Sequence, residues 1–433
     1  MAQDLPEPKI ISRDEHSISR KDIDREALKV LYRLRDAGYD AYLVGGGVRD
    51  LFLGKTPKDF DISTDARPGQ LRKLFKNSRV IGKRFRLVQV FFHGGKIIEV
   101  STLRCQSEFD IDGPVEVLAA NNTYGTVAED AFRRDLTINA LFYDIKNFTI
   151  IDYVNGVADL KSKSVRIVGE PERRIRRDPV RMMRAIRHAA RLDFHIEPLT
   201  WAAIKDNVAD LKMCPESRLR DELLKDLKDG ASAGWAGLAM DCGLFQILLP
   251  FYLKNPSAET RNLLLACLSV SDRLQRNGAR LPEQFLFALL MLPWAVTEIG
   301  LLDDSADTAK KTNLSKAARD AVDRNLQHLN VKRAQKDAVT HLLTNLPVFI
   351  KYADKEKWPA WLTRKSYFND GLLFYKVYLE ASGGPPIPDE EKIVTEPLPA
   401  AKPGAHRKKP SRQSRTPAFA EDTEGGVFGL RKK

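Results

Sequence analysis

The residues with the clearest chemical potential are two aspartates, Asp59 and Asp61, that follow a run of three glycines, Gly45–Gly47. Phe60 separates the aspartates, as in a short strand whose alternate side chains share a face. Two carboxylates on one strand face lie about 7 Å apart, because a strand rises about 3.3 Å per residue. That spacing suits hard cations, which take oxygen ligands and stabilise charge on a phosphoryl group during transfer.

The glycines stand where a strand is expected to pass into a helix. Ala41–Val44 is predicted as a buried strand and Val48–Leu53 as a short helix. A glycine turn at a helix start offers N–H groups to a phosphate, and Arg49 adds a positive charge beside Gly45 and Gly46. Alone, the aspartates are more often a solvated strand end and the glycines a simple turn. In this order, about a dozen residues apart, they indicate a nucleoside triphosphate site.

Together these strings resemble the polymerase-β nucleotidyltransferase superfamily, and within it the group of bacterial poly(A) polymerases and class II CCA-adding enzymes. The resemblance rests on Gly45-Gly46-x-Val48-Arg49-Asp50-Leu51-x-Leu53-Gly54 followed by Asp59-x-Asp61. The three glycines run directly into Val48-Arg49 rather than into Lys-Ser/Thr, so this motif is not the Walker phosphate loop.

The resemblance implies a metal-dependent catalytic site. Asp59 and Asp61 would bind Mg²⁺, with Mn²⁺ as the alternative, while Gly45, Gly46 and Arg49 would hold the triphosphate. Glu99, in a predicted strand over Lys96–Ser101, is the candidate third catalytic carboxylate. The open alternative for Glu99 is an exposed glutamate at a sheet edge.

A second charged string contains Arg133, Arg134 and Asp135, which we expect on a helix over Glu129–Phe142. Alone it is a charged helix start, in which Asp130 and Arg134 form an ordinary pair. Beside the first motif it resembles the Arg-Arg-Asp motif of the same enzymes, whose residues contact the sugar and phosphates of the nucleotide. The resemblance implies these contacts for Arg134 and Asp135, with Arg133 in support.

A third string begins at Arg177 and Asp178. Pro179 fits a first helical turn with Asp178 as its N-cap, and Asp178, Arg181 and Arg184 are spaced by three along one stripe. A carboxylate beside a guanidinium can recognise the hydrogen-bonding edge of a base. The string resembles the Glu-Asp-x-x-Arg motif by which these enzymes choose a base without a template, although Arg177 replaces the Glu. The alternative is a basic helix that follows RNA phosphates.

The choice within the group rests on further likenesses to poly(A) polymerases. They lie in Val80–Val90, in Ile11–Ile23 and in the basic C-terminal segment. Lys83, Arg84 and Arg86 would favour any nucleoside triphosphate. The resemblance therefore implies addition of AMP from ATP to RNA 3′ ends. The alternatives are CCA addition to tRNA, using CTP and ATP, and an RNA-binding protein that has lost catalysis.

The predicted fold class is α+β, with a small mixed or antiparallel sheet and flanking helices followed by helices only. The predicted parts are a flexible N-terminus over 1–20, a nucleotidyltransferase head over 21–150 with a mobile loop at Asp110–Asn122, a helical neck over 151–250 that carries the base-recognising helix, a helical RNA-binding body over 251–382, and a disordered basic tail over 383–433. The sequence favours neither of two roles for this tail, contact with RNA or solubilisation alone.

Composition bounds the remaining choices. The 433 residues carry a formal charge of +12 and a pI near 9.4, which favours a polyanionic partner such as RNA. No long apolar run predicts a membrane span, and no secretory signal is evident. The four cysteines are scattered, so structural zinc and a disulfide framework are not expected. We expect a cytoplasmic protein.

Overall fold

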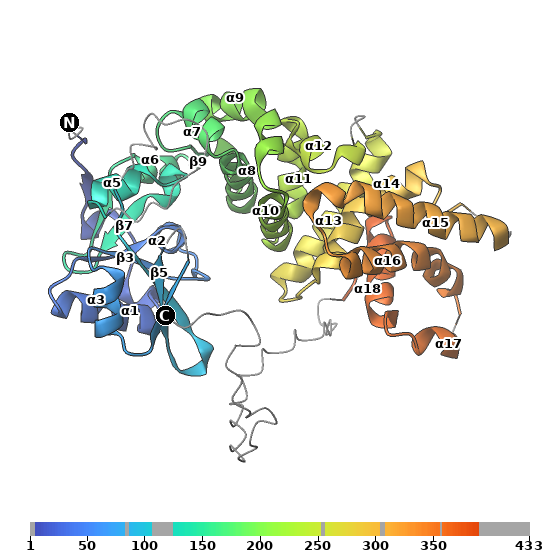
Figure 1. The fold of residues 1–433 in the computed structure, drawn as a ribbon, viewed down its shortest axis with the longest axis horizontal. Helices are drawn as coiled ribbons and strands as arrows, with labels where there is room; N and C mark the ends of the chain where they lie inside the picture. Colours follow the sequence, from blue (N-terminus) through green and yellow to red (C-terminus); the bar gives the residue numbers. More distant parts are fainter. Residues whose placement is uncertain are drawn as a thin grey trace, which may run out of the picture. The chain divides into compact units, whose positions relative to one another are not determined.

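The computed structural model describes residues 5–82, 86–105, 124–252, 256–303, 308–355 and 357–388, with only the backbone of 308–313. The predicted loop at Asp110–Asn122, the cations Lys83 and Arg84, and the basic tail from residue 389 onward lie outside these residues. Figure 1 shows a sheet with flanking helices in the N-terminal part and helices in the C-terminal part, which confirms the α+β fold class.

One eight-stranded sheet organises the N-terminal part, in the order β1-β8-β7-β2-β3-β6-β5-β4. Every neighbouring pair is antiparallel except β3 and β6, which run parallel, so the predicted mixed sheet is confirmed. The strands are β1 (Lys9–Ile11), β2 (Ala41–Val44), β3 (Asp61–Thr64), β4 (Ser78–Ile81), β5 (Leu87–Phe91), β6 (Ile97–Thr102), β7 (Leu141–Asp144) and β8 (Thr149–Asp152).

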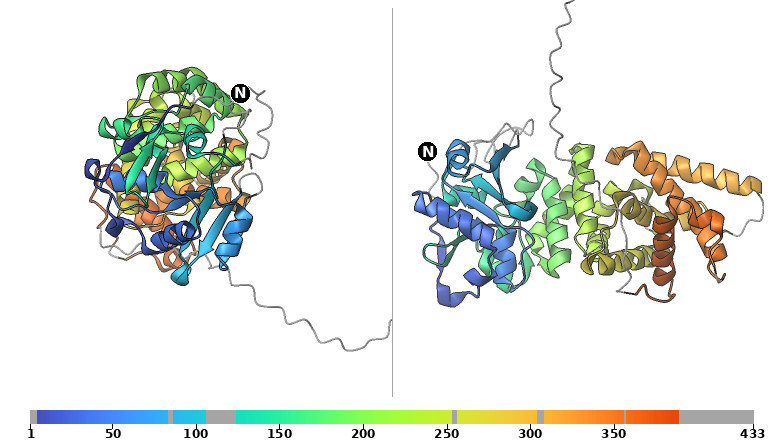
Figure 2. Two further views of the ribbon diagram at one scale, coloured as in Figure 1. Left: turned by 90° about the vertical axis from the view of Figure 1, so that its left-hand side faces the viewer. Right: turned by 90° about the horizontal axis from the view of Figure 1, so that it is seen from below.

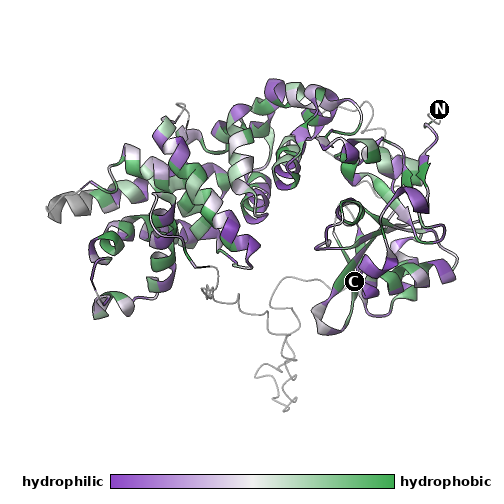
Figure 3. Ribbon diagram, turned by 180° about the vertical axis from the view of Figure 1, so that it is seen from behind, coloured by the Kyte–Doolittle hydropathy of each residue, from purple (hydrophilic) through white to green (hydrophobic). Residues whose placement is uncertain are grey.

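Four helices accompany this sheet: α1 (Arg25–Asp36), α2 (Gly46–Phe52), α3 (Pro68–Leu74) and α5 (Val127–Phe132). The carboxylate of Asp24 accepts the N–H groups of Glu26 and Ala27, which starts α1. α1 buries its apolar stripe against β2, β3 and β6, and α3 packs on β4 and β5. Figure 3 shows the strands mostly in the green of hydrophobic residues, as expected for a sheet at the core.

The sequence predicted a flexible N-terminus over residues 1–20, but part of this segment packs against the sheet. β1 pairs antiparallel with β8, Ile11 and Ile18 are buried, and a ring nitrogen of His16 hydrogen-bonds the carbonyl of Phe148. The physical reason is that the edge of β8 offers backbone partners, and isoleucine side chains gain by burial there.

The helix expected over Glu129–Phe142 is also shorter. α5 ends at Phe132, a 3₁₀ turn covers Thr137–Asn139, and β7 begins at Leu141. β7 pairs with both β2 and β8, so its backbone gains hydrogen bonds on two sides. This tertiary pairing outweighs the local helix propensity.

Beyond β8 the described chain is almost wholly helical (Figure 2), apart from two short parallel strands, β9 (Ser164–Val165) and β10 (His195–Ile196). α14 is buried on all sides through Phe285–Pro293. The helices are α6 (Gly156–Lys161), α7 (Pro171–Arg177), α8 (Val180–Leu192), α9 (Pro198–Asn207), α10 (Glu216–Lys228), α11 (Ser232–Asp241), α12 (Leu244–Leu248), α13 (Ala258–Arg276), α14 (Glu283–Glu298), α15 (Thr308–Asn325), α16 (Arg333–Tyr352), α17 (Ala360–Thr363) and α18 (Phe368–Ala381).

Candidate active site

The glycine turn joins β2 to α2 and brings two other segments close. Gly45 has φ 69° and ψ −139°, a conformation that only glycine adopts without strain. A β-carbon on Gly45 would lie 3.4 Å from Nη1 of Arg134, and one on Gly47 would lie 3.3 Å from the carbonyl oxygen of Asp59. The absence of side chains therefore lets Arg134 and the segment before β3 approach this turn.

The two aspartates lie at the start of β3. Asp59 precedes the strand, Asp61 is its first residue, and both are exposed. Strand register sets Asp61 opposite Val44 of β2 on one side and opposite Glu99 of β6 on the other. The carboxylate of Glu99 accepts a 2.9 Å hydrogen bond from Nε2 of Gln89. The parallel pairing of β3 with β6 thus brings the predicted catalytic acids to one part of the sheet.

The electrostatics of Asp61 fit a cation. Removal from bulk water, followed by the negative charges of Glu99 and Asp59, raises the pKa of Asp61 to about 6, while Arg134 opposes the shift. Asp61 still has an exposed surface, so solvent ions can reach it and the repulsion between carboxylates is partly screened. A divalent cation would relieve that repulsion. Among the described residues, no group of three or more His, Cys, Asp or Glu side chains is placed to hold a metal ion, and the role of Glu99 stays a prediction.

Arg133 and Arg134 follow α5 and share one carboxylate. Nε of Arg133 and Nη2 of Arg134 lie 2.7 and 2.9 Å from the buried Asp130. Burial opposes ionisation of Asp130, but Arg134 and Arg133 lower its pKa below the ordinary value. Arg134 also lies 3.4 Å from Oγ of Ser63 in β3 and stacks over the ring of Phe142. Its guanidinium is thereby held between β3 and the glycine turn.

Asp135 connects this segment to α8. Nη1 of Arg181 lies 2.8 Å from Asp135, and Arg184 donates to the other carboxylate oxygen. Burial opposes ionisation, but Arg181 and Arg184 lower the pKa of Asp135 to about 2. In the described contacts Asp135 therefore orients the arginines of α8, and its predicted contact with a nucleotide stays a prediction.

Asp178 and Arg181, the predicted base-recognising pair, are held by different partners. Asp178 lies between α7 and α8 and makes a two-pronged ion pair with Arg218 of α10, with both N–O distances 2.9 Å. Arg181 contacts Asp135 and donates to the carbonyl of Arg134 at 3.2 Å. The N-cap position of α8 is Pro179 rather than the predicted Asp178, and the carboxylate of Asp178 pairs with Arg218 instead of capping the helix.

Arg49 is buried, unlike a simple phosphate ligand at the surface. Its Nη2 lies 2.7 Å from Asp50, its Nη1 donates to Oδ1 of Asn139 at 2.7 Å, and a ring nitrogen of His188 is 3.3 Å away. Burial lowers the pKa of Arg49. These contacts give Arg49 a structural task that joins α2 to α8, and its contact with a triphosphate stays a prediction.

Sequence reasoning missed the charged face of α10. Glu222 is buried between Arg184 and Arg187, and these two arginines lower its pKa to about 2 although burial opposes the shift. A usable signal existed, because Arg218, Glu222 and Asp226 recur every four residues along one stripe of α10. Besides the pairs of Arg181 and Arg184 with Asp135, the described ion pairs of α8 are Arg184–Glu222, Arg187–Glu222, Arg187–Asp226, Arg191–Asp50 and Arg191–Asp229.

Comparison with known families agrees with this geometry. Residues 41–166 match the family model described as the poly A polymerase head domain. This part of the chain is thus similar to a poly A polymerase head domain. Residues 193–254, beyond this head domain, match a family described as the probable RNA and SrmB-binding site of polymerase A. The resemblance stated from the glycine and aspartate motifs is thereby confirmed.

Curated relatives extend the likeness. Poly(A) polymerase I of Salmonella typhimurium is 46% identical over 296 residues, which are 66% of this chain and 63% of that protein. Poly(A) polymerase I of Escherichia coli O157:H7 is 45% identical over the same shares. The CCA-adding enzyme of Lactobacillus helveticus is 43% identical over 205 residues, 47% of this chain and 50% of that protein. The chain thus spans less than two thirds of the length of each of these relatives.

A solved structure is similar over a longer stretch. The CCA-adding enzyme of Bacillus stearothermophilus in complex with CTP superposes with a TM-score of 0.62 at 27% identity, over 85% of this chain and 80% of that chain. The head domain and the helices after it therefore share one architecture with this enzyme.

Proposed function

We propose that this chain is a template-independent RNA nucleotidyltransferase that adds AMP from ATP to RNA 3′ ends and releases pyrophosphate. The observation that carries the proposal is that Asp59, Asp61 and Arg134 lie close together at the glycine turn. The two carboxylates could bind a metal ion, and the guanidinium beside them could bind phosphates. Phosphoryl transfer depends mainly on such positioning and charge stabilisation. The match of poly(A) polymerases over 296 residues supports adenine as the base.

Asp59 and Asp61 are the proposed metal ligands, with Glu99 as a third catalytic acid beside them. A bound Mg²⁺ or Mn²⁺ would lower the pKa of the RNA 3′-hydroxyl and balance charge on the triphosphate. Removal from bulk water and the negative charges of Glu99 and Asp59 raise the pKa of Asp61, and a cation bound by Asp59 and Asp61 would offset both effects.

Gly45, Gly46 and Arg134 are the proposed contacts of the triphosphate. Gly45 leaves its backbone open on the side that Arg134 approaches. Nε of Arg134 is a buried donor with no hydrogen-bond partner among the described residues. A buried donor without a partner costs about 1–3 kcal/mol, and a phosphate or ribose oxygen would remove that cost. Arg49 would support the glycine turn through its buried contacts with Asp50 and Asn139.

Asp178 and Arg181 are the proposed contacts of adenine, and Arg184 would support Arg181 through their shared partner Asp135. Nε of Arg181 is a second buried donor that lacks a partner in the described part of the chain. Arg218 orients the carboxylate of Asp178, and Asp135 orients the guanidinium of Arg181. The base would therefore bind to a hydrogen-bond acceptor and a donor that are already in place. A fixed pair of this kind can select one base edge without a template strand.

The helices after the head are the proposed carriers of the RNA. We keep the division into a head over 21–150, a neck over 151–250 and a body over 251–382 as part of this proposal. The described residues contain no helix with the length and hydropathy of a membrane span. We propose action in the cytoplasm, where RNA 3′ ends and ATP are both present.

CCA addition to tRNA is the second candidate. The observation in its favour is the superposition, over 85% of this chain, on an enzyme solved with CTP. The shorter aligned stretch of the CCA-adding relative, 205 residues against 296, is the reason we place it second. A catalytically inactive RNA-binding protein is a third candidate, and the presence of both Asp59 and Asp61 argues against it.

The decisive test supplies each nucleotide alone with Mg²⁺ to two RNAs, an unstructured oligonucleotide and a tRNA trimmed of its CCA end. The proposal expects long tails from ATP on the unstructured RNA and little incorporation of CTP on either RNA. Ready incorporation of CMP into the trimmed tRNA would favour CCA addition instead. Chelation of divalent ions with EDTA should stop incorporation, and added Mg²⁺ or Mn²⁺ should restore it.

A further inference from the structure

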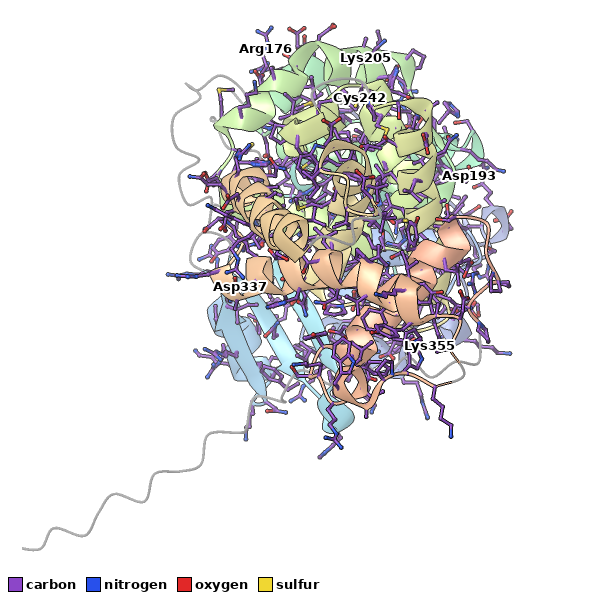
Figure 4. The ribbon with its side chains drawn as sticks, turned by 90° about the vertical axis from the view of Figure 1, so that its right-hand side faces the viewer. Arg176, Asp193, Lys205, Cys242, Asp337 and Lys355 are labelled. Carbon is purple, nitrogen blue, oxygen red and sulfur yellow. The ribbon has the colours of Figure 1, made fainter. Side chains whose placement is uncertain are left out.

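The end of α16 and the short helix α17 carry exposed aromatic and cationic side chains outside the candidate active site. Trp361 of α17 is 50% exposed. Its ring meets the ring of Tyr352 edge to face at 6.1 Å, and Nζ of Lys355 lies 4.7 Å from the centroid of Tyr352. Figure 4 labels Lys355 among the C-terminal helices. We call Tyr352, Trp361 and the cations described next the α16–α17 face.

The charge of this face is strongly positive. Residues 349–368 hold five lysines and arginines against two acids. All five cations are exposed, and none makes a salt bridge with another residue in the part of the chain that the structure describes. Positive charges left uncompensated on one surface attract a polyanion. These cations are Lys351, Lys355, Lys357, Arg364 and Lys365.

A second aromatic pair continues the face along α16. The exposed ring of His341 stacks on Tyr367 at 5.9 Å with an interplanar angle of 9°. His341 and Tyr352 are eleven residues apart in one helix, so they lie near one stripe and about 16 Å apart along it. The face is therefore elongated, as a binding site for an extended chain would be.

The exposed tryptophan stands on an anchored support. Trp358, just before α17, packs on Phe349 of α16 at 5.5 Å and on Phe368 of α18 at 6.1 Å, and Leu362 of α17 is fully buried. Trp361 is thus held outward by a packed helix rather than by a loose one. A ring fixed in this way loses little conformational entropy when a partner stacks on it.

We propose that the α16–α17 face binds single-stranded RNA, with bases on the Trp361 ring and phosphates on the surrounding cations. Aromatic rings within a cationic surface are the usual means of holding single strands without regard to sequence. Double-stranded RNA has no exposed base faces to stack. A protein partner is disfavoured because the exposed large apolar side chains here are only Trp361 and Ile350. The face lies outside both matched family regions, 41–166 and 193–254.

This inference deepens the proposed function by naming where the RNA body is held, and its test is independent of catalysis. The full chain is titrated into a fluorescently labelled oligouridine without ATP or divalent metal, and anisotropy gives the Kd. Trp361→Ala should raise the Kd about 5- to 100-fold, and Trp361→Phe should recover most of the affinity. Ile97→Ala, which removes another exposed apolar side chain, is the matched control and should bind as the unchanged chain does.

A second measurement addresses the charges. The double variant Arg364→Glu with Lys365→Glu should flatten the fall of affinity with salt concentration, because fewer counterions are released on binding. Unchanged affinity in Trp361→Ala would overturn the proposal. So would an equal loss of affinity for the single strand and for a duplex, since only stacking distinguishes the two. Neither outcome would count against the proposed transferase activity, because the binding assay contains no ATP and no divalent metal.

Discussion

At the residue scale, the candidate site is a set of charges whose partners are fixed before any ligand arrives. Arg134 is oriented by Asp130, Arg181 by Asp135, and Asp178 by Arg218. Such preorganisation removes the cost of reorienting charged groups when the substrate binds. The exposed Asp61 is different, because Glu99 and Asp59 repel its ionised form while only Arg134 opposes them, and a bound cation would relieve that repulsion.

Arg218→Ala should therefore weaken base selection rather than abolish transfer. Without its two-pronged partner the carboxylate of Asp178 is free to rotate, and the proposed acceptor for adenine is no longer fixed. We expect the ratio of kcat/KM for ATP to that for CTP to fall about 10-fold, or ~1.4 kcal/mol. Steady-state rates with each nucleotide measure it.

Arg220→Ala is the control for this variant, because Arg220 lies on the same helix and pairs with the exposed Asp221. A loss of selectivity as large in Arg220→Ala as in Arg218→Ala would show that any change in α10 suffices, and the specific role of Arg218 would have to be abandoned.

At the scale of elements, α8 is the connector. Its arginines pair with Asp135 after α5, with Asp50 of α2 and with three acids on or beside α10. The apolar side of α8 is buried as well, through residues such as Met182, Met183 and Ile186. The helix that carries Arg181 is thus tied to the head by charge and by packing together.

Glu222→Gln should destabilise the fold by about 3 kcal/mol at neutral pH, because the buried Arg187 loses one of its two partners. The lowered pKa of Glu222, about 2 against an ordinary 4.5, sets the pH dependence. Its ion pairs stabilise the fold fully above pH 4.5, and this contribution is lost as the pH falls towards 2.

Urea unfolding at pH 6, 4 and 2.5 measures this effect. The difference in free energy of unfolding between the unchanged chain and Glu222→Gln should shrink as the pH falls. The exposed Glu216→Gln should show no such difference, and a constant gap for Glu222→Gln at all three pH values would contradict this assignment.

Much of the head could be predicted from sequence, because its signals are local. The strand Ala41–Val44 has the predicted bounds, since the local apolar pattern there agrees with the packing. The segment after α5 could not be predicted in this way, because the pairing of β7 with β2 joins residues about a hundred positions apart. The partner of Asp178 was hidden for the same reason, as Arg218 lies 40 residues away. The contacts of the buried Arg49 were hidden as well, since Asn139 lies 90 and His188 lies 139 residues away in the sequence.

At the scale of the whole molecule, we expect net charge to govern the encounter with the proposed RNA substrate. A formal charge of +12 predicts an affinity that falls steeply as salt rises, because bound phosphates release counterions. Residues 402–433 contribute nine lysines and arginines against three acids, and their charged, polar composition predicts no packed core.

Deletion of residues 402–433 should therefore weaken RNA binding at low salt several-fold and flatten its salt dependence, while the thermal midpoint of unfolding stays the same. Anisotropy at three salt concentrations and a thermal melt measure both effects. An unaltered salt dependence would mean that the segment does not contact phosphates, and a lower midpoint would mean that it takes part in the fold.

The carboxylate pair at the start of β3 is tested most directly by single-turnover incorporation of labelled ATP into an RNA primer with saturating Mg²⁺. Asp61→Asn keeps the size of the side chain and removes the charge, so the rate should fall by at least about 1,000-fold, or ~4 kcal/mol of transition-state stabilisation. The variant should still fold, because Asp61 is exposed at a strand end. A folded Asp61→Asn protein that extends RNA at the rate of the unchanged chain would contradict metal-dependent transfer at this site.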